Sequence, residues 1–310
     1  MITAIIDCGT NTFNLLVVDY EIQGDYHVLL NTKKSVKLAE GGLENNKIAP
    51  KAFDRGIKAF VEFVKTANKY QPGRIHAVAT SAIRSSVNGP DFVKKVFDKT
   101  GVMIQVLNGD TEAQYIYKGV RLALDNIQEP ILIMDIGGGS TEFIIAHKNN
   151  VLWKKSFELG AARLLQQYQP SDPVTADQIN SLKTHFKNIL QPLTHQLKKQ
   201  SINYLIGCSG TFESIADIIK TDKNEPENSD KLFSFQEKDF RNTCKKLIAS
   251  TEEQRKQLPG LVNFRVDTIV YGSILIQFVK KRYKIPNMVY STYALKEGIL
   301  YDLIHEKVVL

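Results

Sequence analysis

Two segments place an aspartate at the end of an apolar run and follow it with glycine and hydroxyl side chains. The first runs from Asp7 through Gly9 to Thr12, and the second runs from Asp135 through three glycines to Thr141. Glycine lets the backbone approach an anion closely, turn amides can point at phosphate oxygens, and hydroxyl groups add donors. Carboxylates are the oxygen ligands that Mg²⁺ prefers. These residue types therefore predict a phosphate site with a divalent cation.

Each segment lies between two β-rich apolar runs, which predicts a β-hairpin whose turn carries the polar groups. A Walker loop needs Gly-Lys-Ser/Thr at the start of a helix, and this lysine is absent from both segments. A dinucleotide fingerprint needs a helix after its glycines, whereas Phe143–Ile145 favours a strand. One such hairpin alone is as well explained by an ordinary tight turn. The repeat of the same pattern favours a functional interpretation.

Two further positions carry polar groups at the ends of predicted elements. Residues 209–211 read Ser-Gly-Thr between a strand at 204–208 and a helix, which is a third candidate phosphate loop. Glu112 falls in the first turn of a helix expected from 109 to about 126. Taken from the residues alone, a carboxylate favoured by the helix dipole explains Glu112 better than catalysis does.

The elements that position these residues alternate between strands and helices, which indicates an α/β fold. With 310 residues the chain is long enough for two domains. The periodicity predicts strands at 74–79 and 102–107 and a polar surface loop at 221–230. The predicted helices cover residues 50–70, 90–99, 174–200, 266–281 and 293–305.

Composition excludes several functional classes. The net charge of +7, from 40 basic and 33 acidic residues, suits an anionic ligand, but no arginine-rich arm supports nucleic-acid binding. Cys8, Cys208 and Cys244 match no zinc or disulfide spacing, so reduced thiols are expected, and Cys8 lacks the basic neighbours of a nucleophile. The N-terminus lacks a basic leader and no apolar run has the length of a membrane span. We therefore expect a cytoplasmic protein without a membrane partner.

Several segments together resemble the exopolyphosphatase and guanosine-pentaphosphate phosphohydrolase family, in the family's order and over nearly the whole chain. The unbroken Asp-Ile-Gly-Gly-Gly-Ser-Thr-Glu at 135–142 is the most specific of them. The other matching segments are Asp7–Phe13, Ala79–Arg84, Phe157–Leu164, Gly207–Thr211, Leu258–Leu261, Arg265–Asp267 and Ala294–Gly298. The chain resembles the short, two-domain form of the family.

This resemblance implies two actin-like, ribonuclease H-like domains around a central cleft. The first would cover residues 1–121, completed by the C-terminal helix at 292–310, and the second would cover residues 122–291. The implied activity is that of an exopolyphosphatase, a hydrolase that releases terminal phosphate from inorganic polyphosphate. Three alternatives stay open: a guanosine pentaphosphate phosphohydrolase, a catalytically weak polyphosphate or alarmone sensor, and an ATP-dependent kinase of the same fold. A homodimer is also left open.

The resemblance assigns roles to individual residues. Family members carry Ser-Gly-x-Glu-Glu-Ala-Arg with the second Glu as catalytic base; here that Glu is Glu112, while Thr111 and Gln114 replace the first Glu and the Arg. Asp135 and Glu142 are also implied in catalysis and, with Asp7, in holding Mg²⁺ or another divalent cation. The implied phosphate-binding residues are Gly9, Thr10, Asn11, Thr12, Arg84, Gly137, Gly138, Gly139, Ser140, Thr141, Gly210, Thr211 and Arg265.

Overall fold

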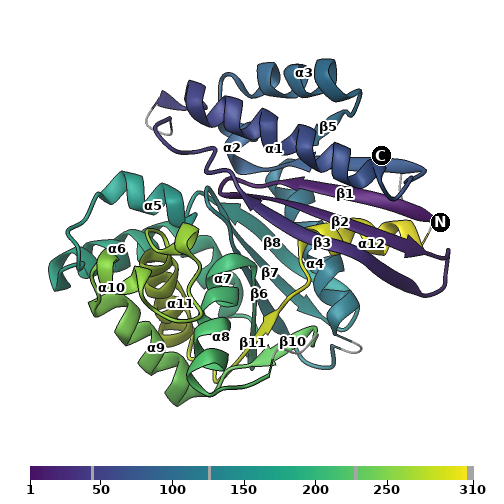
Figure 1. Ribbon diagram of the computed structural model, residues 1–310. Coiled ribbons are helices and arrows are strands. Elements are labelled where there is room, and N and C mark those ends of the chain that lie inside the picture. Colours follow the sequence, from purple (N-terminus) through teal and green to yellow (C-terminus); the bar gives the residue numbers. More distant parts are fainter. Residues whose placement is uncertain (43–44, 125–126, 227–229, 306–310) are drawn as a thin grey trace. The chain divides into compact units, whose positions relative to one another are not determined.

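The chain forms two compact units, each built on one β-sheet with helices packed against it (Figure 1). The computed structural model describes residues 1–42, 45–124, 127–226 and 230–305. Unit 1 consists of residues 1–122, 137–139 and 293–310. Unit 2 consists of residues 123–136 and 140–292.

The sheet of unit 1 has the strand order β3-β2-β1-β4-β5. The first three strands form an antiparallel meander, whereas β4 and β5 run parallel to β1. The central strand β1 is apolar on both faces, as expected of a strand covered from both sides. The strands are β1 (Ile2–Cys8), β2 (Thr12–Tyr20), β3 (Tyr26–Ser35), β4 (Arg74–Ala79) and β5 (Ile104–Val106).

Helices cover both faces of this sheet, with α1 and α3 on one face and α4 and α12 on the other (Figure 1). Helix α1 buries Ile57, Phe60 and Val64 against the sheet at the spacing of one helix face, which confirms the predicted amphipathic helix. The helices of unit 1 are α1 (Pro50–Asn68), α2 (Ser81–Ser85), α3 (Gly89–Thr100), α4 (Gly109–Ala123) and α12 (Leu295–Ile304).

The last helix, α12, supports α4 within unit 1. A Cβ atom at Gly298 would lie 1.8 Å from the carbonyl oxygen of Tyr115, so the two helix backbones approach closely at this point. Lys118 of α4 forms a 2.5 Å ion pair with Asp302 of α12, which is buried. Because α4 carries Glu112 in its first turn, α12 helps to fix the position of this carboxylate.

The sheet of unit 2 has the strand order β10-β11-β9-β6-β7-β8. Its core lies between the sheet and a layer of helices, of which α11 is buried along most of its length (Figure 1). The strands are β6 (Ile131–Ile136), β7 (Thr141–His147), β8 (Asn150–Phe157), β9 (Tyr204–Cys208), β10 (Leu232–Ser234) and β11 (Asn287–Ser291). The helices are α5 (Ala161–Tyr168), α6 (Ala176–Ile189), α7 (Gln191–Leu197), α8 (Ser209–Asp222), α9 (Glu237–Ala249), α10 (Glu252–Lys256) and α11 (Ile269–Tyr283).

The two sheets repeat one arrangement, an antiparallel meander followed by parallel strands. This arrangement confirms the expected α/β fold built from two similar units. The two predicted hairpins are β1–β2 and β6–β7, and their aspartates hold equivalent positions. Asp7 pairs across the first hairpin with Asn14, and Asp135 pairs across the second with Glu142.

Three predicted elements differ from the structure. The helix expected at 174–200 is two helices, α6 and α7. The first helix ends at its C-cap Leu190, and Pro192 lies in the first turn of the second, where its missing amide hydrogen is tolerated. The helix expected from 266 begins at Ile269, since a 3₁₀ turn occupies Asn263–Arg265. The loop expected at 221–230 begins later because α8 continues to Asp222, and residues 227–229 lie outside the described part of the chain.

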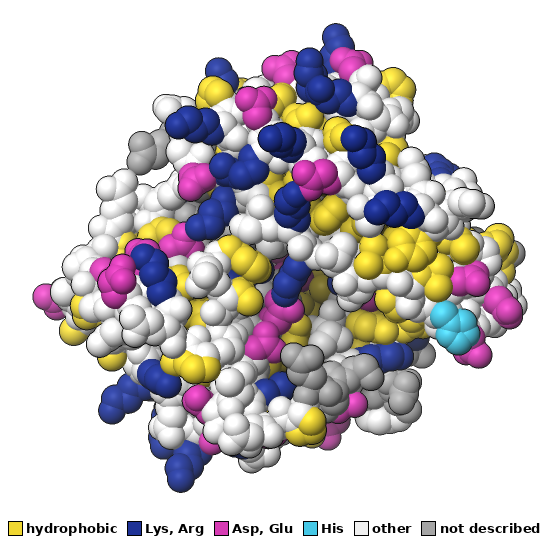
Figure 2. Space-filling view, viewed as in Figure 1, with side chains coloured by type: hydrophobic (Ala, Val, Ile, Leu, Met, Phe, Trp, Pro, Cys, Tyr) yellow, Lys and Arg dark blue, Asp and Glu magenta, His cyan; other side chains and the backbone are white. Residues whose placement is uncertain are grey.

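The surface of unit 1 is rich in positive charge. Figure 2 shows lysine and arginine side chains gathered over the region of α1 and α3, where all six lysines of these two helices are exposed: Lys51, Lys58, Lys65, Lys94, Lys95 and Lys99. Within the described ranges, no helix combines the length and the apolar character that crossing a membrane requires.

A buried histidine predicts an acid-sensitive fold. His76 lies on β4 with only 6% of its surface exposed, and burial together with the charge of Arg74 lowers its pKa to about 4. In the unfolded chain the His76 imidazole is protonated below about pH 6.5, whereas in the folded chain it stays neutral down to about pH 4. Relative to His76→Gln, we expect the native protein to lose about 2–3 kcal/mol of unfolding free energy between pH 7 and pH 4.5. Urea titrations at both pH values measure this difference, and equal losses in the two proteins would contradict it.

Candidate active site

The turn of the first hairpin is held rigidly by a neighbouring loop. The Gly9 amide donates to the carbonyl of Thr12 at 3.1 Å, closing the turn. The carbonyls of Thr10 and Asn11 accept amides from residues 36–38 at 2.8–2.9 Å, and both residues are buried. Because their carbonyls are already bonded, the backbone of this turn is fixed before any ligand arrives.

Asp7 has a hydrogen-bond partner that the sequence did not reveal. The side-chain amide of Asn14 donates to Asp7 Oδ2 at 3.0 Å across the hairpin. This donor orients the Asp7 carboxylate, which is only partly buried. The pairing of β1 with β2 is the signal that identifies Asn14, since it stands opposite Asp7 in the register.

The triple-glycine turn belongs to unit 1 and packs against the first turn. A Cβ atom at Gly139 would lie 2.4 Å from Ser81 Oγ and 3.1 Å from Thr10 Oγ1. A Cβ atom at Gly138 would lie 2.9 Å from the Asn11 side chain. Only glycine therefore fits at this close approach, and the predicted phosphate-binding residues of the two turns are neighbours within unit 1.

Arg84 and Glu112 form an ion pair at the edge of the same unit. Arg84 Nη1 donates to Glu112 Oε2 at 2.6 Å and to the carbonyl of Leu107 at 3.0 Å. Glu112 is only 6% exposed and lies in the first turn of α4, which Asn108 caps by accepting the Thr111 amide at 2.8 Å. Arg84 fixes the orientation of the Glu112 carboxylate, so its primary contact is with this acid.

Helix α2 connects the turns to this ion pair. Ser81, its first residue, lies against Gly139, and Arg84, almost one helical turn later, holds Glu112. One turn of α-helix spans about 5 Å. The short helix therefore places a buried carboxylate close to the glycine-rich turns of unit 1.

Unit 2 contributes a pair of buried carboxylates. Asp135 and Glu142 are paired in the β6–β7 hairpin and are 5% and 1% exposed. Burial and the charge of Glu142 raise the pKa of Asp135 to about 7, although a hydrogen bond from Ser209 and the charge of Arg265 oppose this. Ser156 on β8, another residue that the sequence did not indicate, donates to Glu142 Oε1 at 2.6 Å. Two adjacent buried carboxylates favour a bound cation.

Thr141 uses its side chain within the fold. Its hydroxyl donates to the carbonyl of Leu159 at 2.8 Å, and the residue is fully buried. The single hydroxyl hydrogen is therefore used within the fold, so a contact of Thr141 with phosphate would come from its backbone amide and stays a prediction. Ser140, the preceding residue, is also buried, at 3% exposed.

The third candidate loop brings Arg265 against the start of α8. A Cβ atom at Gly210 would lie 1.8 Å from the Arg265 guanidinium, so the side chain occupies the space that glycine leaves. Arg265 is 8% exposed, its Nε meets no hydrogen-bond partner among the residues that the structure describes, and burial lowers its pKa. Together with the backbone amides at Gly210 and Thr211, this buried cation makes up a candidate anion-binding corner in unit 2, and phosphate binding there stays a prediction.

Adding a methyl group at Gly210 tests this corner. In Gly210→Ala the new Cβ would overlap the guanidinium, so Arg265 must move away from the helix terminus. We expect the KM for a phosphate-bearing substrate to rise about tenfold, the loss of roughly one charge-assisted hydrogen bond, with a smaller change in kcat. Steady-state phosphate release measures both. Gly73→Ala is the control, because its Cβ would meet only the Ile2 carbonyl at 3.8 Å; equal KM values in the two variants would contradict the assignment.

The donor set fits a divalent ion that keeps part of its water shell. Among the described residues, no group of three or more His, Cys, Asp or Glu side chains is arranged to hold a metal by itself. Mg²⁺ usually binds one or two carboxylates together with water and substrate phosphate. Asp135 and Glu142 match this requirement. Cys8 is not a competing nucleophile, since it is 1% exposed and burial raises the pKa of its thiol.

Comparison with known proteins places these features in a family. A family model described as the Ppx/GppA phosphatase family matches residues 17–307. A solved exopolyphosphatase from Cytophaga hutchinsonii ATCC 33406 is 33% identical, covers 100% of this chain and 99% of that chain, and superposes with a TM-score of 0.96. An Aquifex aeolicus member of the Ppx/GppA family is 21% identical with a TM-score of 0.79, over 99% of this chain and 98% of that chain, and shares the fold.

These matches confirm the resemblance found in the sequence. They also confirm the expected enzyme class, a phosphoanhydride hydrolase. The chain belongs to the Ppx/GppA phosphatase family.

Proposed function

We propose that this protein is an exopolyphosphatase that hydrolyses the terminal phosphate of inorganic polyphosphate. The proposal depends on one observation: helix α2 contacts the glycine turn through Ser81 and orients the buried Glu112 through Arg84. The similarity to a solved exopolyphosphatase supports the choice of substrate. The exposed lysines of α1 and α3 raise the local concentration of a polyanion.

In the proposed mechanism the chain's residues mainly position and stabilise charge. The amides and hydroxyls of the Thr10 and Gly138 turns bind the terminal phosphate, and the Arg265 corner binds a second anionic group. Asp135 and Glu142 would hold Mg²⁺ or another divalent ion, which neutralises phosphoryl charge when bound. Glu112 orients the attacking water and accepts its proton, and Arg84 keeps the carboxylate in place.

A phosphate-release assay tests the substrate. Long-chain polyphosphate, tripolyphosphate and guanosine pentaphosphate are each incubated with the protein and Mg²⁺, and we expect the highest kcat/KM on polyphosphate. Release from guanosine pentaphosphate alone would establish the nucleotide hydrolase instead. Tight polyphosphate binding without release under any divalent metal would establish a sensor, and phosphate transfer to an acceptor without free phosphate would establish a kinase.

A further inference from the structure

Helix α10 carries an arginine that lies inside unit 2 although the helix is only one turn long. Thr251 and Gln254 form a capping box that starts the helix, and Arg255 near its end is 5% exposed. Burying a guanidinium is costly unless its donors are bonded, so the partners of Arg255 indicate what it does.

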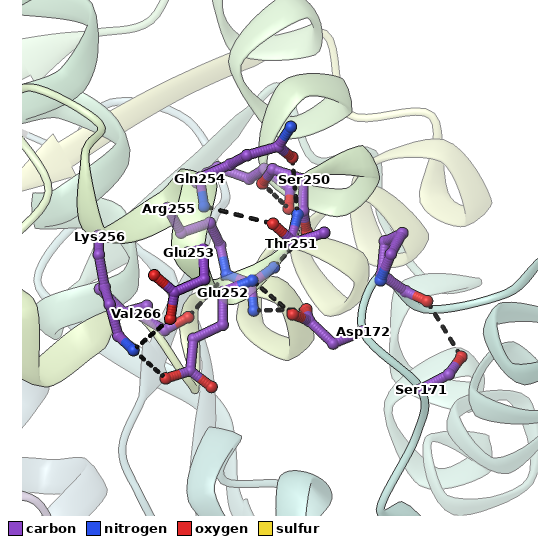
Figure 3. A network of polar contacts seen from close by, with 12 residues as sticks. Ser171, Asp172, Ser250, Thr251, Glu252, Glu253, Gln254, Arg255, Lys256 and Val266 are labelled. Carbon is purple, nitrogen blue, oxygen red and sulfur yellow. Dashed lines mark hydrogen bonds and ion pairs between the residues drawn. The ribbon is translucent and has the colours of Figure 1, made fainter.

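All three nitrogen positions of Arg255 reach acceptors on different segments (Figure 3). Nε donates to the carbonyl of Val266 at 2.8 Å, Nη1 donates to the carbonyl of Ser250, and Nη2 pairs with Asp172 Oδ1 at 3.0 Å. Asp172 also accepts the amide of Glu252, at the first residue of α10. The planar fork of arginine satisfies these directions together, which a lysine ammonium cannot.

The Val266 contact joins Arg255 to the anion-binding corner. Val266 directly follows Arg265, whose 3₁₀ turn leads into α11, and the amide of Thr268 returns to the Arg265 carbonyl at 3.1 Å. The Nε bond therefore holds the end of the turn from which the Arg265 side chain reaches Gly210. Each of the Arg255 nitrogens Nε, Nη1 and Nη2 donates to an acceptor of the protein itself, so an effect of Arg255 on a bound anion would act through Arg265.

We propose that Arg255, held by Asp172, is a positioning residue that sets the place of the Arg265 guanidinium. The proposal rests on the proposed function only in that Arg265 binds substrate phosphate. It makes two predictions that can be measured separately. The first concerns the rigidity of the turn that carries Arg265, and the second concerns the affinity for a phosphate anion.

Hydrogen exchange tests the first prediction without a substrate. In Arg255→Met, peptides covering residues 262–268 should exchange about tenfold faster, because the bond from Arg255 Nε that holds the end of the turn at Val266 is lost. Asp172→Asn leaves the Val266 and Ser250 carbonyls in place but removes the charge of the ion pair and one of the two oxygens that accept from Arg255 and Glu252, so it should show the same effect in smaller degree. Lys256→Met is the control, since Lys256 pairs with the exposed Glu252 and Glu253 on its own helix. Unchanged exchange in Arg255→Met would overturn the proposal whatever the protein hydrolyses.

A double-mutant cycle tests the second prediction. Tripolyphosphate affinity is determined by calorimetry for the native protein, Arg255→Met, Arg265→Met and the double variant, each checked for folding by circular dichroism. If Arg255 acts through Arg265, the double variant should bind within about twofold of Arg265→Met. Arg255→Lys should not restore the affinity, because it cannot make the three contacts. Additive losses would overturn the proposal, and a loss in Arg255→Met that exceeds the loss in Arg265→Met would do the same.

The two failures are distinguishable. If the native protein releases no phosphate from polyphosphate, the proposed function fails, while the exchange data and the tripolyphosphate cycle still decide the role of Arg255. If the native protein releases phosphate but Arg255→Met shows unchanged exchange or the double-mutant cycle shows additive losses, the proposed role of Arg255 is wrong and the proposed function is unaffected.

Discussion

Glu112→Gln is expected to lower kcat for phosphate release from polyphosphate by about 10²–10⁴-fold, the contribution of a positioned general base. Glutamine has the size of glutamate and keeps an oxygen acceptor for Arg84, but it cannot take a proton from water. The phosphate-binding turns are untouched, so KM and tripolyphosphate affinity should stay within about twofold. Steady-state phosphate release and calorimetry measure these quantities.

Asp110→Asn is the matched control for Glu112→Gln. Asp110 also lies in the first turn of α4, but its side chain is exposed, and its substitution removes the same single charge. Its activity should match that of the native protein. Native turnover in Glu112→Gln would remove Glu112 from the role of base, and an equal loss in Asp110→Asn would show that the charge of the helix terminus matters instead.

Asp135→Asn is expected to lower phosphate release by about 10²–10³-fold and to weaken Mg²⁺ binding more than tenfold, because one of two buried carboxylate ligands is lost. The fold should not suffer. The pKa of Asp135 is raised to about 7, so its ionised form costs stability above that pH in the metal-free protein. The melting temperature of metal-free Asp135→Asn at pH 8 should therefore equal or exceed that of the native protein.

The pH dependence of metal binding separates this role from a general loss of charge. A proton on Asp135 competes with the ion, so native Mg²⁺ affinity should fall about tenfold from pH 8 to pH 6, and Asp135→Asn should lack this fall. Asp177→Asn, which removes an exposed charge at the start of α6, should behave like the native protein. Mg²⁺ affinity that is independent of pH in the native protein would argue against Asp135 as a ligand.

The hairpins could be predicted from the sequence because their signals are local. An aspartate, a glycine-rich turn and two apolar β-rich runs lie within about fifteen residues, and strand pairing of neighbours is the simplest way to bury both runs. The helix at 174–200 was overestimated because its polar and apolar periodicity continues across Leu190, whereas Pro192 restarts the backbone hydrogen bonds. Periodicity reports the buried face and is insensitive to such a break.

The residues that support the site could not be predicted because their roles arise from tertiary contacts. Asn14 and Ser156 are ordinary strand residues until the register places them opposite Asp7 and Glu142. Arg255 lies 11 residues from its carbonyl partner Val266 and 83 from Asp172, so nothing local marks it as buried. Thr141 illustrates the reverse case, in which a motif residue is used by the fold.

The packing of α12 on α4 has a consequence for biosynthesis. Unit 1 begins with residues 1–122 and is finished by residues 293–310, with roughly 170 residues of unit 2 between them. At ribosomal rates of about 5–20 residues per second, roughly 10–30 seconds pass between the synthesis of α4, which carries Glu112, and the synthesis of its partners Gly298 and Asp302. In a nascent chain the helix that carries Glu112 therefore lacks the support of α12 until residues 293–304 have been made, and unit 2 is synthesised before unit 1 can be completed.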